Sequence, residues 1–217
     1  MRVGVLGTGV VGATLATKFL DVGDEVVMGS RDASNGRATE WAAGTGGKGR
    51  AGTFADAAEF GEVVVNATSG RASLAALELA GADNLAGKVL VDVAIPLDFS
   101  QGMPPSLTVA NTDSLGESLQ RAFPSARVVK AFNTVNASVM VNPTDLLAPT
   151  NLFVAGNDQE AKGKVVSMLG SFGWAAERIV DLGGISAARG LEAYVLFWVS
   201  LMQALGTPVF NISVVKA

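Results

Sequence analysis

Residues 1–32 read MRVGVLGTGVVGATLATKFLDVGDEVVMGSRD. An apolar run over 2–7 leads into a glycine-rich turn, an amphipathic stretch follows over 11–22, and a second apolar run occupies 25–30. Two apolar runs that flank a helical pattern within about 30 residues are typical of a β-α-β unit. The stretch therefore predicts two parallel strands and their crossover helix.

The rest of the chain repeats this alternation. Apolar runs predict strands over 62–68, 88–94, 127–132, 151–156, 176–182 and, as a final edge strand, 211–215. The loop 44–53 is expected to lead into a short third strand or an irregular segment. Helical patterns fall at 32–43 after the cap candidate Asp32, and at 54–61, 72–80, 114–123, 158–172 and 185–206. Continuous apolar strands between helices indicate a parallel sheet covered on both faces. We therefore predict an α/β, Rossmann-type doubly wound, mostly parallel sheet in one domain over 1–217. Its dinucleotide-binding core covers about 1–150, and a short C-terminal extension, about 151–217, contains one long helix.

Composition narrows the function classes. The 217 residues are 49% hydrophobic and 17% charged with a net charge of −4, which argues against a general nucleic-acid or anionic-membrane binder. The chain has no cysteine and no histidine, so disulfides, thiolate chemistry and the commonest acid/base group are excluded, and we predict no metal site. No signal peptide is visible, and a cytoplasmic location is expected. The apolar run 193–206 is shorter than the roughly 20 residues of a membrane span, so a core or interface helix is expected there.

The glycine turn GTGVVG places Gly7, Gly9 and Gly12 in the spacing G-x-G-x-x-G. In the context of strand, turn and helix, the first glycine permits a tight turn, the second lets a pyrophosphate approach the backbone, and the third allows close helix–strand packing. The helix N-terminus then offers free N–H groups to the phosphates. A tight turn without a ligand is the alternative. The pattern predicts a dinucleotide site.

The end of the second predicted strand indicates which dinucleotide is bound. An acidic residue there accepts hydrogen bonds from the ribose hydroxyls of NAD(H), whereas an arginine beside a small hydroxyl accommodates the 2′-phosphate of NADP(H). Here the strand ends in Gly29, Ser30 and Arg31, and Arg37 follows one to two helical turns later. NADP(H) is therefore predicted, with a solvated loop arginine as the alternative.

Several segments together resemble one family. MRVGVLGTGVVGATLA, VVMGSRD, VVKAFNTV, LFVAGND and GGISAARGLEA occur in the order found in the F420-dependent NADP reductases, and the module also resembles the nucleotide-binding domain of the six-transmembrane ferric reductases. The resemblance covers almost the whole chain. It implies an enzyme that transfers hydride between NADP(H) and a flavin-like acceptor, either coenzyme F420 or a flavin such as FMN or FAD.

The resemblance also implies site residues. The residues that match the pyrophosphate loop are Thr8, Gly9, Val10 and Val11, and those that match the 2′-phosphate pair are Ser30 and Arg31. The segment beside the dinucleotide bridge is matched by Ala67, Thr68 and Ser69, and the segment beside the nicotinamide by Ala94, Ile95 and Pro96. Direct hydride transfer needs two rings held together and water excluded. A wall of Ile95, Pro96, Phe132 and Asn133 would do this, with Ile95, Pro96 and Asn133 positioning the nicotinamide and the acceptor.

The chain departs from the family pattern at two places, because it lacks a histidine near Asn133 and an aromatic residue near Ser69. These departures put the second substrate in doubt. Asn133 is alternatively a turn residue, and Lys130 is either a base or a paired lysine. Tyr194 reads as a core or interface residue or as a proton donor. A pyrroline-carboxylate-type or hydroxyacid-type dehydrogenase and a non-catalytic NADP(H) sensor remain the rival functions.

The predicted long helix is apolar nearly all the way round. A helix on a sheet needs only one apolar stripe, so the other apolar faces of 185–205 need a further cover. A partner subunit is the simplest cover, and twofold dimers are the commonest oligomers. We expect a homodimer with this helix near the interface, closing the acceptor pocket, and the alternative is that 135–150 and 211–215 cover it within one chain.

Overall fold

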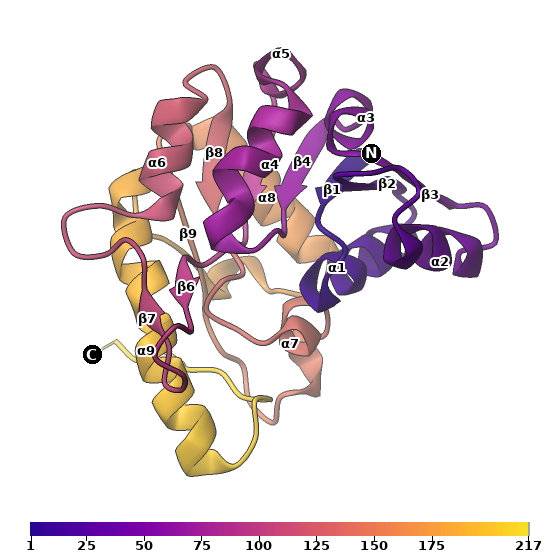
Figure 1. Cartoon of the computed structure of the whole chain (residues 1–217). Coiled ribbons are helices and arrows are strands. Elements are labelled where there is room, and N and C mark those ends of the chain that lie inside the picture. The colour runs from indigo at the N-terminus through magenta and orange to yellow at the C-terminus, as the bar shows by residue number, and fades with distance from the viewer. Residues whose placement is uncertain (217) are drawn as a thin grey trace.

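A twisted eight-stranded sheet forms the centre of the computed structural model, which describes residues 1–216 (Figure 1). The strand order is β10-β9-β8-β5-β4-β1-β2-β3, and every pair is parallel except β8 with β9. The strands span β1 (Arg2–Leu6), β2 (Glu25–Ser30), β3 (Gly49–Thr53), β4 (Val63–Asn66), β5 (Val89–Asp92), β8 (Arg127–Lys130), β9 (Leu152–Gly156) and β10 (Ile179–Asp181). The predicted doubly wound, mostly parallel sheet is confirmed, and β9 of the C-terminal part joins the same sheet.

Helices cover both faces of the sheet. One face carries α1 (Val10–Asp21), α2 (Gly36–Gly44), α7 (Ala137–Val141) and α8 (Gln159–Ser171), and the other carries α3 (Phe54–Phe60), α4 (Ser73–Ala80), α5 (Ala82–Leu85), α6 (Leu115–Ala122) and the start of α9 (Ala188–Leu205). The two hydrophobic cores alternate along each strand because successive side chains point to opposite faces: Val3 and Val5 enter one core and Leu6 the other. Four single turns complete the order, η1 (Gly70–Ala72), η2 (Pro143–Asp145), η3 (Ala176–Arg178) and η4 (Ile185–Ala187), with a small hairpin of β6 (Leu97–Asp98) and β7 (Ser106–Leu107).

Three sequence predictions fail locally. The predicted loop over 44–53 contains the strand β3 (Gly49–Thr53), and α3 follows β3 directly, so no strand follows that loop. The second helix begins at Gly36 rather than at 32, because Asn35, and not Asp32, caps it by accepting a hydrogen bond from the Ala38 N–H (3.2 Å). Asp32 instead binds the backbone N–H and hydroxyl of Ser34 (both 2.8 Å), which holds a turn. The predicted edge strand over 211–215 is also wrong, since this tail has no ladder and is held by side chains such as Asn151, which accepts from the Val214 N–H (2.7 Å).

The C-terminal helix is longer than its apolar run predicts. With η4 it spans Ile185–Leu205, has a mean hydropathy of 1.2, and by length and composition alone is able to cross a membrane. Soluble core helices pass the same test, and Glu192 on this helix is 1% exposed and bound inside the protein. The buried carboxylate makes the first half of the helix part of this fold. Its second half presents apolar side chains outward, including Phe197 (57% exposed) and Leu205.

Candidate dinucleotide and acceptor site

The glycine turn joins β1 to α1 in the geometry that its spacing predicts. Gly7 has a φ of +119°, and a Cβ atom there would stand 2.5 Å from the Ala67 carbonyl oxygen. A Cβ atom at Gly12 would stand 2.2 Å from the Gly7 carbonyl oxygen, so this residue lets the helix approach the turn. Gly9 differs from both, because a Cβ atom there meets nothing within 4 Å. Gly7 and Gly12 are thus required by the fold, whereas Gly9 faces open space.

The open space lies at the N-terminus of α1. Gly9 is the N-cap residue, and no side chain caps the helix. The first N–H groups of an α-helix have no intrahelical acceptor and carry a partial positive charge. At Val10 and Val11 they are therefore available to an anion, and the Val10 side chain beside them is 78% exposed. Thr8 and Gly9 complete the rim of this turn.

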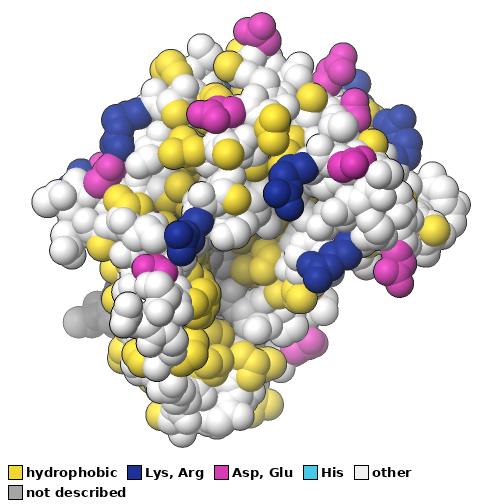
Figure 2. All heavy atoms as spheres, viewed as in Figure 1, with side chains coloured by type: hydrophobic (Ala, Val, Ile, Leu, Met, Phe, Trp, Pro, Cys, Tyr) yellow, Lys and Arg dark blue, Asp and Glu magenta, His cyan; other side chains and the backbone are white. Residues whose placement is uncertain are grey.

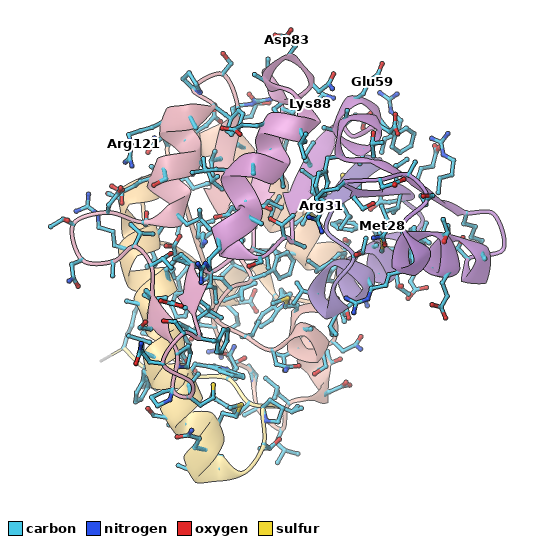
Figure 3. All side chains as sticks on the ribbon, viewed as in Figure 1. Met28, Arg31, Glu59, Asp83, Lys88 and Arg121 are labelled. Carbon is cyan, nitrogen blue, oxygen red and sulfur yellow. The ribbon has the colours of Figure 1, made fainter. Side chains whose placement is uncertain are left out.

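The end of β2 presents a hydroxyl and a guanidinium. Ser30 is 5% exposed, and its Oγ donates to the Asp32 carbonyl oxygen. Arg31 is exposed and makes no ion pair among residues 1–216. Figure 3 shows Arg31 near the middle of the view, with Lys88 above it and Asp83 at the top of the molecule. Arg37, in the first turn of α2, lines a separate hollow between α1 and α2 with Thr8 and Gly9.

A cavity of about 750 Å³ opens at the carboxyl ends of the central strands, beside the glycine turn. Figure 2 shows the molecule hollowed there, with apolar side chains along the α9 side. Its lining comprises Val10, Val11, Ala67, Thr68, Ser69, Gly70, Arg71, Val93, Ala94, Ile95, Leu97, Phe99, Ser100, Asn133, Thr134, Val135, Asn136, Ala137, Met140, Val195 and Trp198. In open α/β sheets, ligands bind at this end of the strands.

The cavity brings together much of the predicted site, from four separate segments. Val10, Val11, Ala67, Thr68, Ser69, Ala94, Ile95 and Asn133 all line it. Two residues of the predicted wall do not: Pro96 is buried behind Ile95, and Phe132, 1% exposed, faces Phe172 in the core (ring centroids 6.0 Å apart). Phe132 has a positive φ of 65° and lies beyond the end of β8 at Lys130, and its ring lies in the core instead of the predicted wall.

Several residues that line the cavity were not among the predicted site residues. Trp198 and Val195 come from α9, the helix that was expected to close the acceptor pocket, but neither residue was named in advance as a site residue. Gly70 is needed for close contact, since a Cβ atom there would stand 2.2 Å from the Ile95 carbonyl oxygen. The sequence signal for Gly70 was its position, two residues after the end of the fourth predicted strand. Tyr194 does not line the cavity, and burial raises the pKa of its hydroxyl.

The polar groups of the cavity are nearly all neutral. Arg71 is the one ionisable residue among the lining residues, with its side chain 63% exposed and its Nη1 3.4 Å from Asp98 Oδ1. Asn133 donates from Nδ2 to the Leu191 carbonyl oxygen (2.7 Å), which ties the end of β8 to α9. Three buried polar atoms of the lining have no hydrogen-bond partner in the described chain: Asn133 Oδ1, Thr134 Oγ1 and Trp198 Nε1.

Comparison with known proteins places this site in context. Residues 2–96 match the family model of the NADP oxidoreductases described as coenzyme F420-dependent. A solved structure from Arthrobacter sp. FB24, provisionally described as an F420-dependent NADP reductase, is 48% identical, with each chain covered completely and a TM-score of 0.95. The F420-dependent NADP reductase of Methanothermobacter marburgensis is 29% identical over 88% of each chain.

Two further similarities concern longer proteins. Rat metalloreductase STEAP3 is 31% identical over 88% of this chain, but the chain spans only 36% of that protein. An imine reductase from Streptomyces aurantiacus shares the fold, with a TM-score of 0.67 and 21% identity over 94% of this chain and 64% of the other. The resemblance drawn from the sequence motifs is therefore confirmed by both sequence and structure comparison.

Proposed function

This chain belongs to the coenzyme F420-dependent NADP oxidoreductase family, and we propose that it transfers hydride between NADP(H) and a deazaflavin acceptor of the F420 type. The family consists of NADP-dependent oxidoreductases. The choice of acceptor is the proposal. Flavins such as FMN and FAD have no comparable support from the relatives and serve as test substrates.

The observation that carries the proposal is the chemistry of the cavity wall. Reduction of a carbonyl or an imine requires a proton donor at the reacting atom, whereas direct hydride transfer between two rings requires orientation and exclusion of water. Among the lining residues only Arg71 is ionisable, and its side chain is largely in solvent. The wall therefore suits ring-to-ring hydride transfer better than a hydroxyacid-type or pyrroline-carboxylate-type dehydrogenase.

The residues of the glycine turn fit a dinucleotide. Gly9 leaves room above the turn, and the N–H groups of Val10 and Val11 would bind the pyrophosphate. Arg31, with Ser30 beside it, would bind the 2′-phosphate because it is exposed and makes no ion pair in the described chain. When bound, NADPH supplies a hydride, and the acceptor takes up that hydride together with one proton from water.

The remaining cavity wall would hold the acceptor. Ile95 and Val195 provide apolar surface, and water is excluded where such surfaces close on a ring. The unpartnered atoms of Asn133, Thr134 and Trp198 are buried beneath this surface.

The oligomeric state, the cellular location and the partners of the protein are also proposals. We propose a homodimer in which a second copy covers the outer face of α9, where Leu196, Phe197 and Leu205 are at least 40% exposed. A cytoplasmic location fits the proposed use of NADPH. No nucleic-acid partner is expected at a net charge of −4.

The deciding experiment is an NADPH-oxidation screen with F420, FMN, FAD, riboflavin and ferric chelates as acceptors. Turnover with F420, at least tenfold faster than with any flavin, is expected. NADPH binding without oxidation by any acceptor would instead identify a sensor. Turnover with ferric chelates alone would contradict the deazaflavin assignment and favour the chemistry named by the metalloreductase relative.

A further inference from the structure

Three polar residues close the neighbouring ends of three central strands. Asn66, Asp92 and Lys130 are the last residues of β4, β5 and β8, and they are paired in register across the sheet. All three are completely buried. Asn66 donates from Nδ2 to Asp92 Oδ1 (2.9 Å), and its own Oδ1 accepts from the hydroxyl of Thr68 (2.6 Å). The row therefore reaches the cavity lining at Thr68.

Lys130 connects this row to the C-terminal helix. Its Nζ lies 2.8 Å from Asp92 Oδ2 and 2.8 Å from Glu192 Oε1, and it also donates to the Ala94 carbonyl oxygen. An ammonium group has three protons, so these three acceptors use all of them. Burial acts to lower the pKa of Lys130, but the two carboxylates outweigh burial and raise the pKa above its ordinary value. Lys130 is therefore charged, connects these segments through its hydrogen bonds, and is not available as a base.

Two acceptors of Lys130 belong to different segments that line the cavity or adjoin its lining. Ala94 lines it and precedes Ile95, and the Ala94 N–H also donates to Asp92 Oδ1 (3.2 Å). Glu192 lies one helical turn before Val195, which also lines the cavity. Glu192 also accepts from the N–H groups of Leu115 (2.8 Å) and Gly116 (3.0 Å) at the start of α6, so its position is fixed from two directions.

We propose that Lys130 and Glu192 are positioning residues for hydride transfer, because their ion pair fixes α9 relative to the strand-end segment that carries Ala94 and Ile95. The inference rests on the proposed function, since it takes both segments to be part of the wall against which the two rings are held. Hydride transfer is sensitive to the separation of the reacting atoms, and a displacement of about 1 Å can cost on the order of a hundredfold in rate. Binding of NADPH depends mainly on the glycine turn and Arg31, which lie outside this ion pair.

Glu192→Gln is the informative variant. The amide keeps the size of the carboxylate and one hydrogen-bond acceptor, and it leaves Lys130 balanced by Asp92 alone. We expect the Kd for NADPH to stay within about twofold, whereas kcat with F420 falls at least tenfold, as a misplaced α9 predicts. The matched control is Lys162→Met, which removes another buried lysine from an ion pair, with Asp181 at 2.8 Å, outside the cavity lining. This control should leave kcat unchanged.

Hydrogen exchange supplies a readout that does not depend on the acceptor. Backbone amides of α9 should exchange at least tenfold faster in Glu192→Gln than in the wild type, whereas those of β1 and α1 should not change. If Glu192→Gln fails to fold, the double variant Lys130→Met/Glu192→Gln, which removes both charges of the pair, takes its place with the same expectations.

Wild-type protein that does not turn over F420 would refute the proposed function alone, and hydrogen exchange would then decide the positioning role. Unchanged kcat with unchanged α9 exchange overturns the inference, as does an equal loss of kcat and NADPH affinity.

Discussion

Replacing Gly9 by valine separates the role of the glycine turn in folding from its role in binding. A Cβ atom at this position meets nothing within 4 Å, and the backbone is extended (φ −77°, ψ 179°), so a β-branched residue fits. Losing a glycine at the N-cap costs about 0.5–1 kcal/mol, and the lower entropy of the unfolded chain offsets about 0.4–1 kcal/mol. The free energy of unfolding should therefore change by less than about 1 kcal/mol.

Binding of NADPH should respond very differently. The valine methyl groups would occupy the space through which a pyrophosphate reaches the N–H groups of Val10 and Val11. A hydrogen bond to a charged group contributes about 1.5–3 kcal/mol, so the loss of one or two such bonds, about 1.5–6 kcal/mol, should raise Kd at least tenfold and up to about ten-thousandfold. Isothermal titration calorimetry with NADPH measures this, and urea unfolding measures stability on the same samples.

Two comparisons make the Gly9 experiment decisive. Gly163→Val, on an exposed position of α8 that also has nothing within 4 Å, should leave Kd unchanged. Gly12→Ala should instead destabilise the protein by about 1–3 kcal/mol or more, because its Cβ would overlap the Gly7 carbonyl. If Gly9→Val bound NADPH within twofold of the wild type, the turn would not be the pyrophosphate site.

Three further expectations follow from other parts of the structure. Arg31→Ala should remove most of an at least tenfold preference for NADP(H) over NAD(H), and equal calorimetric affinities of the wild type for both would contradict the 2′-phosphate assignment. The Arg189 guanidinium holds the pKa of Glu117 below its ordinary value (Nη2 to Oε1, 2.6 Å), so this pair stabilises the fold above the ordinary glutamate pKa and the contribution is lost as pH falls through the lowered value. Urea unfolding at pH 6 and pH 3 should therefore show a smaller loss for Glu117→Gln than for the wild type, and equal losses would refute this linkage. Light scattering at micromolar concentration should give about twice the 22.1 kDa of one chain, and a stable single-chain mass would refute the dimer.

The sequence predicted the parts of the site that lie near one another along the chain. The glycine turn, Ser30 and Arg31 were identified because a β-α-β unit places them by local rules. Ala67–Ser69 and Ala94 were placed by the family resemblance, and they line the cavity because they follow the ends of adjacent parallel strands.

Contacts between residues far apart in the sequence could not be predicted in this way. Trp198 lines the cavity only because Glu192 and Asn133 dock α9 across the strand ends, and sequence periodicity carries no information about docking. Phe132 was expected in the cavity wall, but the strand ends at Lys130, φ at Phe132 is positive, and the ring lies in the core. Asp32 was mistaken for the helix cap because Asn35, three residues later, is an equally good cap residue.

The late position of Glu192 affects how the protein is made. Lys130 leaves the ribosome 62 residues before Glu192, and during that interval its ammonium group has only Asp92 as a charged partner. Chains fold from the N-terminus as they are synthesised, so the nucleotide-binding half can assemble early but holds an incompletely compensated buried charge until the last helix emerges. A nascent chain stalled before residue 192 should therefore be protease-sensitive around β8, and one stalled after release of α9 should be resistant.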